Sequence, residues 1–145
     1  MTRRHIIAKL LGGLAHRVAR VEALRPATVE ELTADEDTLD LVAFNLMLAV
    51  QTACDVASHV IADQRLRPAS SLAESFERLA QERVISAPTA AQLARAVGLR
   101  NVVAHAYHRL DVATVHAAAT SGLADLEAFA REVSAWLSAH DADGA

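Results

Sequence analysis

The amino-acid sequence predicts an all-α protein, an up-and-down bundle of about four to five helices. Hydrophobic residues make up 52% of the chain, yet the aromatic residues are one Trp, one Tyr and three Phe, so most of the apolar residues are Ala, Leu and Val. That mixture favours helices over strands. Apolar residues also recur every three or four positions, and no segment alternates as a half-buried strand does.

The first half of the sequence predicts two long helices with a short helix between them. Apolar positions at helical spacing run over residues 5–24, and Pro26 ends this helix because proline cannot continue the hydrogen-bond ladder. A capping box that begins at Thr28 predicts a short helix next. The longest pattern, over residues 37–63, contains neither Gly nor Pro, and we expect it to close before Pro68.

The second half predicts three more helices. A capping box at Ser71 precedes a helix of about three turns that breaks at residues 84–86. A proline suits the first turn of the next helix, which extends over about residues 88–110. Asp111 is the predicted N-cap of the last helix, which we expect to kink at residues 121–122.

The sequence predicts a single domain over residues 1–145, with a frayed tail at 140–145. A chain of this length can bury a hydrophobic core without disulfide or metal support. Gly98 lies inside a predicted helix, where glycine costs about 1 kcal/mol relative to alanine. We therefore expect another backbone to come close at this position.

Composition excludes several classes of protein. A net charge of −4 argues against a protein that coats nucleic acid by bulk electrostatics, so any contact with RNA has to be local. The single cysteine, Cys54, lies in an apolar run and is expected to be buried rather than reactive. No charge-free apolar run is long enough to span a membrane, and the apolar stretch after Arg4 lacks a small-residue cleavage site. These features favour a cytoplasmic protein without a membrane segment.

The most informative stretch runs from Arg100 to Tyr107. Arg100, four spacers, His105, one spacer and Tyr107 follow one another, and Asn101 stands directly after the arginine. In a shuffled chain of this composition the same spacing would occur about 0.004 times, so chance explains it poorly.

This stretch resembles the R-x4-6-H-x-Y motif of HepT-like toxins, a branch of the HEPN superfamily. The likeness extends over about residues 37–136, where a long helix with Asp55 and His59, a proline-containing loop, a short helix, the motif helix and a last helix follow in the same order. Leu99 stands where an aromatic residue is common in that family, and Ala106 fills a spacer that is often acidic. Neither departure touches a motif residue.

The resemblance implies the toxin of a type II toxin–antitoxin system, acting as a metal-independent endoribonuclease without a cofactor. RNA carries its own nucleophile in the 2′-hydroxyl, so a site needs a base, charge stabilisation at the phosphate and an acid for the leaving group. His105 suits proton transfer because imidazole exchanges protons near neutrality. Arg100 suits the phosphate because its planar fork of donors matches two phosphate oxygens. These two residues are the predicted catalytic pair.

Asn101 and Tyr107 are predicted to support this pair. Asn101 is placed to orient either the histidine or the substrate, and Tyr107 is placed to hydrogen-bond a phosphate or to stack on a base. The resemblance also implies a partner, an MNT-type nucleotidyltransferase antitoxin that silences the toxin by transferring adenylate to a tyrosine. Tyr107 is then the residue to be adenylylated.

Helical geometry constrains the catalytic pair. At about 100° per residue, Arg100, Ala104 and Tyr107 share one face of a continuous helix, whereas Arg100 and His105 point about 140° apart. One straight helix therefore does not aim both catalytic side chains at one phosphate. Either the helix loosens near its end, or two copies of the motif meet across a two-fold axis. The HEPN resemblance implies the second arrangement, a homodimer.

Asp55, His59 and His108 are candidates for the wall of an RNA cleft. Asp55 and His59 lie four residues apart on one helix face, where a simple side-chain pair is an equally good explanation. His108 borders the motif, although exposed histidines are common.

Two other functions remain open from the sequence. A non-catalytic helical module that binds a nucleotidyltransferase is the first, and the presence of both Arg100 and His105 weighs against it. A metal-dependent enzyme with His105, His108 and either Asp55 or His59 as ligands is the second, although these residues lack a strong ligand spacing such as His-x3-His.

Overall fold

The structure is a computed structural model, and it describes the backbone of residues 3–144 and the side chains of residues 3–140. Within these residues the chain forms seven α-helices and one 3-10 helix, with no strand. The all-α prediction is confirmed, but the predicted count of about four to five helices is too low. The helices are α1 (Arg3–Leu24), α2 (Val29–Ala34), α3 (Glu36–Asp63), α4 (Leu72–Gln81), α5 (Ala87–His105), η1 (Tyr107–Arg109), α6 (Val112–Ala119) and α7 (Ser121–Gly144).

The count rises because two features that the sequence indicated, the short helical segment after Thr28 and the kink in the last helix, make α2, α6 and α7 separate helices. Asp35 ends α2 and at the same time caps α3, because its Oδ1 accepts the backbone N–H of Thr38 at 3.1 Å. The predicted last helix is divided into α6 and α7 at Thr120, whose backbone angles (φ −114°, ψ −90°) leave the helical region. The break comes one residue before the expected kink.

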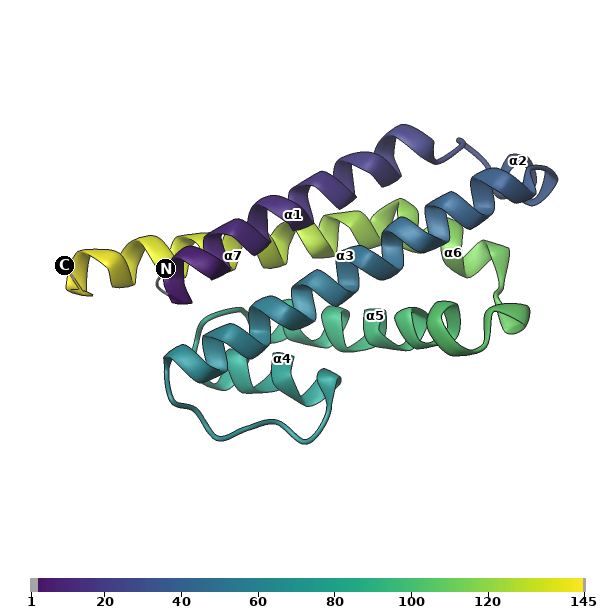
Figure 1. Cartoon of the computed structure of the whole chain (residues 1–145). Helices are drawn as coiled ribbons and strands as arrows, with labels where there is room; N and C mark the ends of the chain where they lie inside the picture. Colours follow the sequence, from purple (N-terminus) through teal and green to yellow (C-terminus); the bar gives the residue numbers. More distant parts are fainter. Residues whose placement is uncertain (1–2, 145) are drawn as a thin grey trace.

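The long helix α3 forms the centre of the molecule. It contacts all six other α-helices, and Figure 1 shows it crossing the bundle between α1 on one side and α4 and α5 on the other. By length and composition α3 passes the test for a membrane-crossing helix, with a mean hydropathy of 1.5, but 56% of that stretch is buried inside the bundle. Its apolar character is therefore accounted for by its central place in the core.

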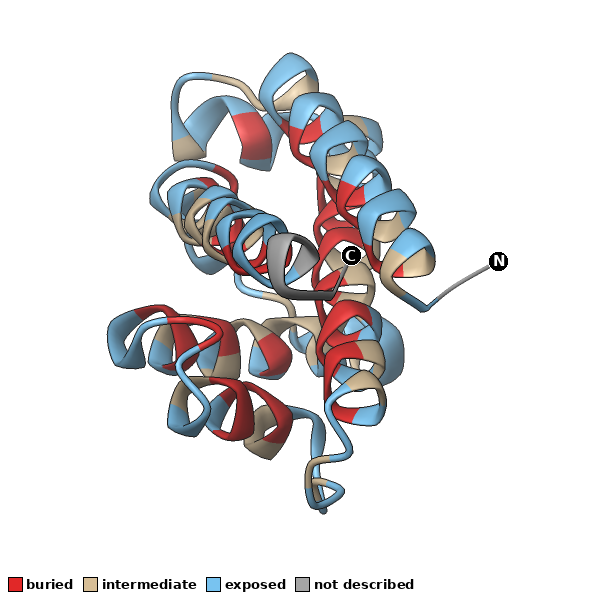
Figure 2. Ribbon diagram, turned by 90° about the vertical axis from the view of Figure 1, so that its left-hand side faces the viewer, coloured by how far each residue is buried: buried red, intermediate tan, exposed pale blue. Residues whose placement is uncertain are grey.

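The buried residues lie on the sides of the helices that face the interior of the bundle (Figure 2). Phe76 of α4 and Phe129 of α7 are fully buried and meet edge to face, with ring centroids 5.6 Å apart. Such a pair adds about 0.5–1.5 kcal/mol beyond the burial of its area. Cys54 is buried as predicted, and this burial raises the pKa of its thiol to about 11. Among the described residues, every buried side-chain nitrogen and oxygen has a hydrogen-bond partner.

The predicted helix starts are confirmed. The hydroxyl of Thr28 accepts the N–H of Glu31, and the hydroxyl of Ser71 accepts the N–H of Glu74, each at 3.1 Å. Asp111 is the N-cap of α6, but its carboxylate accepts a hydrogen bond from the Thr114 hydroxyl at 2.8 Å and none from a backbone N–H.

Helix α3 ends at Asp63, as the sequence predicts, whereas α4 ends at Gln81, before the predicted break at residues 84–86. Arg65 (φ 53°) and Arg83 (φ 59°) adopt the left-handed conformation just after these helices. The N–H of Leu66 then donates to the carbonyl of Ile61 at 2.9 Å and closes the last turn of α3. Glycine is the residue that usually marks such a position, and arginine occupies it here, so the sequence carries no visible stop signal.

The motif helix is also shorter than predicted. Helix α5 ends at His105 rather than near residue 110, because Ala106 (φ −146°, ψ 45°) leaves the helical region and residues 107–109 form the turn η1. Histidine and tyrosine, which follow one another here, are weak helix formers. No other part of the described structure lies within 4 Å of the position that a Cβ would take at Gly98, so the expectation that another backbone comes close there is wrong.

Helix α7 continues to Gly144, through most of the segment for which the sequence predicts a frayed tail. Residue 145 and the side chains of residues 141–145 lie outside the described part. In Figure 1 the two ends of the chain lie at the same end of the bundle, and η1 lies at the opposite end.

Candidate functional site

The motif residues lie on the last turns of α5 and on η1, beside the first two thirds of α3. Helix α5 packs against α3 and runs in the opposite direction in Figure 1. Arg100 is half-buried in this contact, whereas Asn101, His105 and Tyr107 are exposed. The predicted motif is therefore available to a ligand along one edge of the α3–α5 layer.

Arg100 is anchored to α3 by Gln51. Its Nε and Nη2 both donate to Gln51 Oε1, at 3.0 and 2.7 Å, and its Nη1 donates to Asn101 Oδ1 at 2.9 Å. A guanidinium carries five N–H groups, one on Nε and two on each Nη. Three are used by these bonds, which leaves one on Nη1 and one on Nη2. Asn101 therefore orients the arginine, where the sequence suggested the histidine or the substrate.

Asp55 reaches the motif through Gln51. The amide Nε2 of Gln51 donates to Asp55 Oδ1 at 3.3 Å, so a chain of hydrogen bonds links Asp55, Gln51 and Arg100. His59, one turn further along α3, instead pairs with Arg3, whose Nη1 lies 3.0 Å from His59 Nδ1. The structure thus connects Asp55 with the motif and gives His59 a partner on α1. Gln51 did not stand out in the sequence because one polar residue in a long apolar helix is unremarkable.

His105 is the last residue of α5. Its imidazole is exposed and forms no hydrogen bond within the described part of the chain. Because α5 is continuous from Arg100 to His105, the two side chains remain about 140° apart within one chain. The alternative in which the helix loosens between them is therefore wrong.

Tyr107 lies beyond the end of α5, so the expectation that it belongs to the same continuous helix as Arg100 and Ala104 is wrong. Its hydroxyl donates instead to Oδ1 of Asp40 on α3. Partial burial, this hydrogen bond and the negative charges of Asp40 and Glu36 together raise the pKa of Tyr107 to about 12. The residue nevertheless remains 40% exposed.

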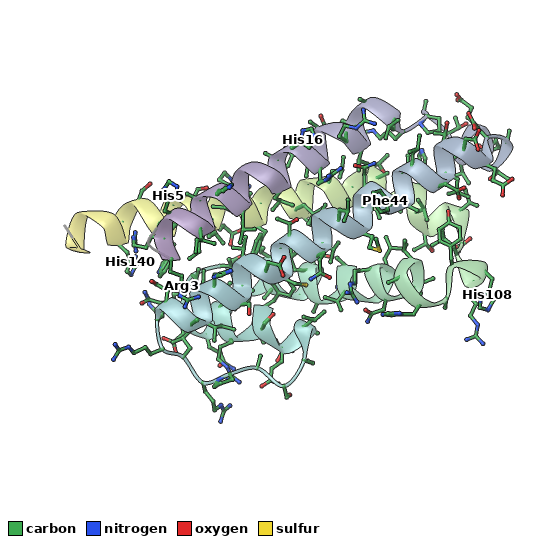
Figure 3. The ribbon with its side chains drawn as sticks, viewed as in Figure 1. Arg3, His5, His16, Phe44, His108 and His140 are labelled. Atoms are coloured by element: carbon green, nitrogen blue, oxygen red, sulfur yellow. The ribbon has the colours of Figure 1, made fainter. Side chains whose placement is uncertain are left out.

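An open groove of 580 Å³ adjoins Tyr107 between α3 and the end of α5. Leu41 and Phe44 project from the same end of α3 with 46% and 50% of their surfaces exposed (Figure 3 labels Phe44). His108 lies at the outer end of η1 and does not line this groove. The residues that line it are Asp40, Phe44, Met47, Val103, Ala104 and Tyr107.

The ligand set considered for a metal-dependent enzyme is not assembled within the chain. Across the described residues, no three or more His, Cys, Asp or Glu side chains gather closely enough to hold a metal ion. His105 is the last residue of α5, His108 lies in η1, and His59 is paired with Arg3.

Comparison with known proteins identifies the family. The model of the family described as ribonuclease HepT-like matches residues 14–133, which include the whole motif. The chain belongs to the HepT-like ribonuclease family. Over 90 residues this HepT-like chain is 34% identical to the mRNA nuclease HepT of Shewanella oneidensis strain MR-1, a match that covers 62% of the chain and 68% of that protein. The resemblance expected from the motif is confirmed.

Solved structures of similar proteins agree with this assignment. The HepT-like chain matches the tri-AMPylated Shewanella oneidensis HEPN toxin, solved in complex with an MNT antitoxin, with a TM-score of 0.84 and 27% identity over 93% of this chain and 99% of that one. A toxin–antitoxin structure with AMP-PNP matches with the same TM-score and identity over 90% of this chain and 98% of that one. The chain is therefore a homologue of HepT-like HEPN toxin ribonucleases in sequence and in fold.

Proposed function

We propose that this chain is the toxin of a type II toxin–antitoxin pair and acts in the cytoplasm as a metal-independent endoribonuclease. The observation that carries the proposal is an anchored arginine with two unused N–H groups, five residues before an exposed histidine that has no hydrogen-bond partner among the described residues. An anchored cation with unused donors suits a phosphate, and an exposed imidazole suits proton transfer.

The reaction follows from these roles. The 2′-oxygen of a ribose attacks the adjacent phosphorus, and the bond from phosphorus to the 5′-oxygen of the next nucleotide breaks. His105 accepts the proton of the 2′-hydroxyl or, when protonated, donates a proton to the departing 5′-oxygen. Arg100 stabilises the negative charge that develops on the phosphate oxygens. The products carry a 2′,3′-cyclic phosphate and a 5′-hydroxyl.

A homodimer reconciles this chemistry with the helix geometry. Because Arg100 and His105 point about 140° apart on one helix, the histidine of one protomer has to meet the arginine of its partner across a two-fold axis. The surface where α3 and α5 meet beside the motif suits such a contact, since Leu41 and Phe44 of α3 expose apolar side chains there. We propose that these side chains are covered by a second copy of the chain.

The proposed inhibitor is an MNT-type nucleotidyltransferase, as in the complexes that the fold resembles. Tyr107 is the single tyrosine of the chain and is exposed enough to be modified. In the modification, its phenolic oxygen attacks the α-phosphorus of ATP, pyrophosphate leaves and the phenolic proton is lost. Adenylate on Tyr107 would fill the groove beside the motif and block RNA. Mass spectrometry of the peptide that contains Tyr107, after incubation with ATP and the antitoxin, tests this step.

Expression of the wild type, Arg100→Ala and His105→Ala tests the proposed nuclease. We expect discrete new RNA ends with a 5′-hydroxyl for the wild type, in the presence of a metal chelator as well, and a loss of at least about 10²-fold in rate for His105→Ala. His105 is exposed in the single chain, so its loss should leave the fold intact, and light scattering checks that the dimer persists. The exposed His16 on α1 offers a matched control, because His16→Ala should cleave as the wild type does.

The results separate the possible functions. Cleavage by His105→Ala at the wild-type rate would show that the proposed site is wrong. Intact RNA with all of the proteins would favour the non-catalytic binding module, whereas cleavage that a chelator abolishes would favour a metal-dependent enzyme.

A further inference from the structure

We infer that Gln51 is a positioning residue for Arg100, and that it has to be a neutral hydrogen-bond acceptor for the arginine to bind RNA phosphate. The inference rests on the proposed nuclease function. It concerns a residue of α3 that lies 49 positions from the arginine in the sequence and outside the motif.

Two hydrogen bonds fix the guanidinium from one side. Gln51 Oε1 accepts hydrogen bonds from both Nε and Nη2 of Arg100. It therefore binds the side of the guanidinium on which these two nitrogens lie. Asn101 accepts a hydrogen bond from Nη1. One N–H group on each Nη then remains free to bind a phosphate. An arginine held in this way loses little further conformational freedom when it binds.

The amide of Gln51 is itself oriented. Its Nε2 donates to Asp55 Oδ1 at 3.3 Å, which keeps Oε1, and not the NH₂ group, turned toward the guanidinium. Both residues of the Gln51–Arg100 contact are half-buried, so the contact is partly shielded from water. Asp55 thus acts on the arginine through an uncharged intermediary and does not pair with it directly.

The neutrality of Gln51 matters because a carboxylate at this place would compete with the substrate. A glutamate of the same shape would accept the same two bonds and form an ion pair with Arg100. The positive charge would then be largely compensated before any phosphate arrived, and charge-assisted bonds to the phosphate would weaken. A glutamine holds the arginine equally well and leaves its full charge for the RNA.

The Gln51→Glu and Gln51→Ala variants of the full chain test this role. The probe is an oligoribonucleotide that spans a cut site mapped with the wild-type protein. For Gln51→Glu we expect at least a tenfold loss in kcat/KM and a weaker dependence of kcat/KM on salt, because a phosphate contact is lost. The new carboxylate also faces Asp55, so the melting temperature is measured to show that the variant is folded at the assay temperature. For Gln51→Ala we expect a loss of about tenfold to a hundredfold, mainly in kcat, because the arginine is no longer held in place.

Gln81→Glu is the matched control. Gln81 Oε1 accepts a hydrogen bond from Arg78 Nη1 at 3.2 Å on α4, so the same substitution changes a Gln–Arg contact into a Glu–Arg contact outside the site. This variant adds the same charge to the chain and should cleave the oligoribonucleotide at the wild-type rate.

If Gln51 has a purely structural role, Gln51→Glu should be more active than Gln51→Ala. The ion pair in Gln51→Glu would then preserve or improve activity, and only Gln51→Ala would lose it. Wild-type cleavage by Gln51→Glu therefore overturns the inference and leaves the proposed function standing. A wild-type protein that cuts no RNA overturns the proposed function and, with it, the inference that rests on it.

Discussion

Tyr107 illustrates how a contact from a distant helix changes the chemistry of one side chain. By its spacing the residue belongs to the motif, but its hydroxyl donates to Asp40, which lies 67 positions earlier in the sequence. The phenol is consequently harder to ionise than an ordinary tyrosine. Because the folded-state pKa is the higher one, this group stabilises the fold below about pH 10, and the contribution is lost as the pH rises from 10 toward 12.

The Asp40→Asn substitution should lower the pKa of Tyr107 part of the way from about 12 toward its ordinary value of 10. The partial burial, which is the largest cause of the shift, remains, but the hydrogen bond to a carboxylate and its charge are removed. The chain has one tyrosine, so the ultraviolet absorbance of tyrosinate during an alkaline titration reports on this residue alone. Asp37→Asn, an exposed change on the same helix, should leave the titration midpoint where it is. A midpoint near 12 in Asp40→Asn would contradict the assigned cause.

At the scale of the elements, α5 is held in place at both ends by side chains from other helices. Near its C-terminal end, Arg100 donates two hydrogen bonds to Gln51 of α3. Its first turn is bound by Glu132 of α7, which accepts the N–H of Ser86 at 2.6 Å and the hydroxyl of Thr89 at 2.5 Å. Partial burial opposes the ionisation of Glu132, but these hydrogen bonds outweigh it and lower the pKa of the carboxyl below 4.5.

The Glu132→Gln variant should lower the free energy of unfolding at neutral pH by about 1 kcal/mol, since a charged acceptor is lost at a partly exposed site. The pKa of Glu132 is depressed by folding, so its stabilisation is present above pH 4.5 and is lost as the pH falls through the folded-state value. Denaturant unfolding of the wild type and of Glu132→Gln at several pH values measures the difference in their free energies of unfolding. The loss of stability in Glu132→Gln should become smaller in acid. Glu127→Gln, which changes an exposed residue on the same helix, should lose little stability at any pH. A deficit of equal size at all pH values would point to packing and not to the charge.

At the scale of the whole molecule, the exposed apolar surface is concentrated where the motif lies. Leu41, Phe44 and Tyr107 are three of the four large hydrophobic residues that are exposed in the described part, and Leu72 on α4 is the fourth. Solvent-exposed aromatic surface next to a functional motif is typical of an interface. The dimer proposed above would cover it.

The Phe44→Ser variant should weaken dimerisation by about tenfold or more, because one aromatic side chain is withdrawn from the interface. Its monomer should unfold at nearly the same denaturant concentration as the wild type, since Phe44 is half exposed in one chain. Light scattering over a range of protein concentrations measures the dimer, and RNA cleavage should fall in parallel with it. Leu72→Ser is the matched control, and a dimer unaffected by Phe44→Ser would place the interface elsewhere.

The sequence by itself determined what depends on neighbours along the chain. Helical periodicity, the caps at Thr28 and Ser71 and the spacing from Arg100 to Tyr107 are local, so the all-α fold and the family could be predicted from them. The ends of α4 and α5 were predicted less well. Arg83 occupies a left-handed position after α4 that glycine would have marked, and Ala106 ends α5 without such a signal.

Only the tertiary structure decided which side chains meet. Gln51 and Asp40 lie 49 and 67 positions from the motif residues that they bind, and no periodic pattern pairs residues across such separations. The antiparallel packing of α3 against α5 brings them together. It leaves Arg100 anchored to Gln51, Tyr107 hydrogen-bonded to the carboxylate of Asp40, and His105 exposed at the end of α5. Residue identity supplied the reactive groups, whereas helix packing set their orientation and ionisation, because both depend on groups from other elements of the fold.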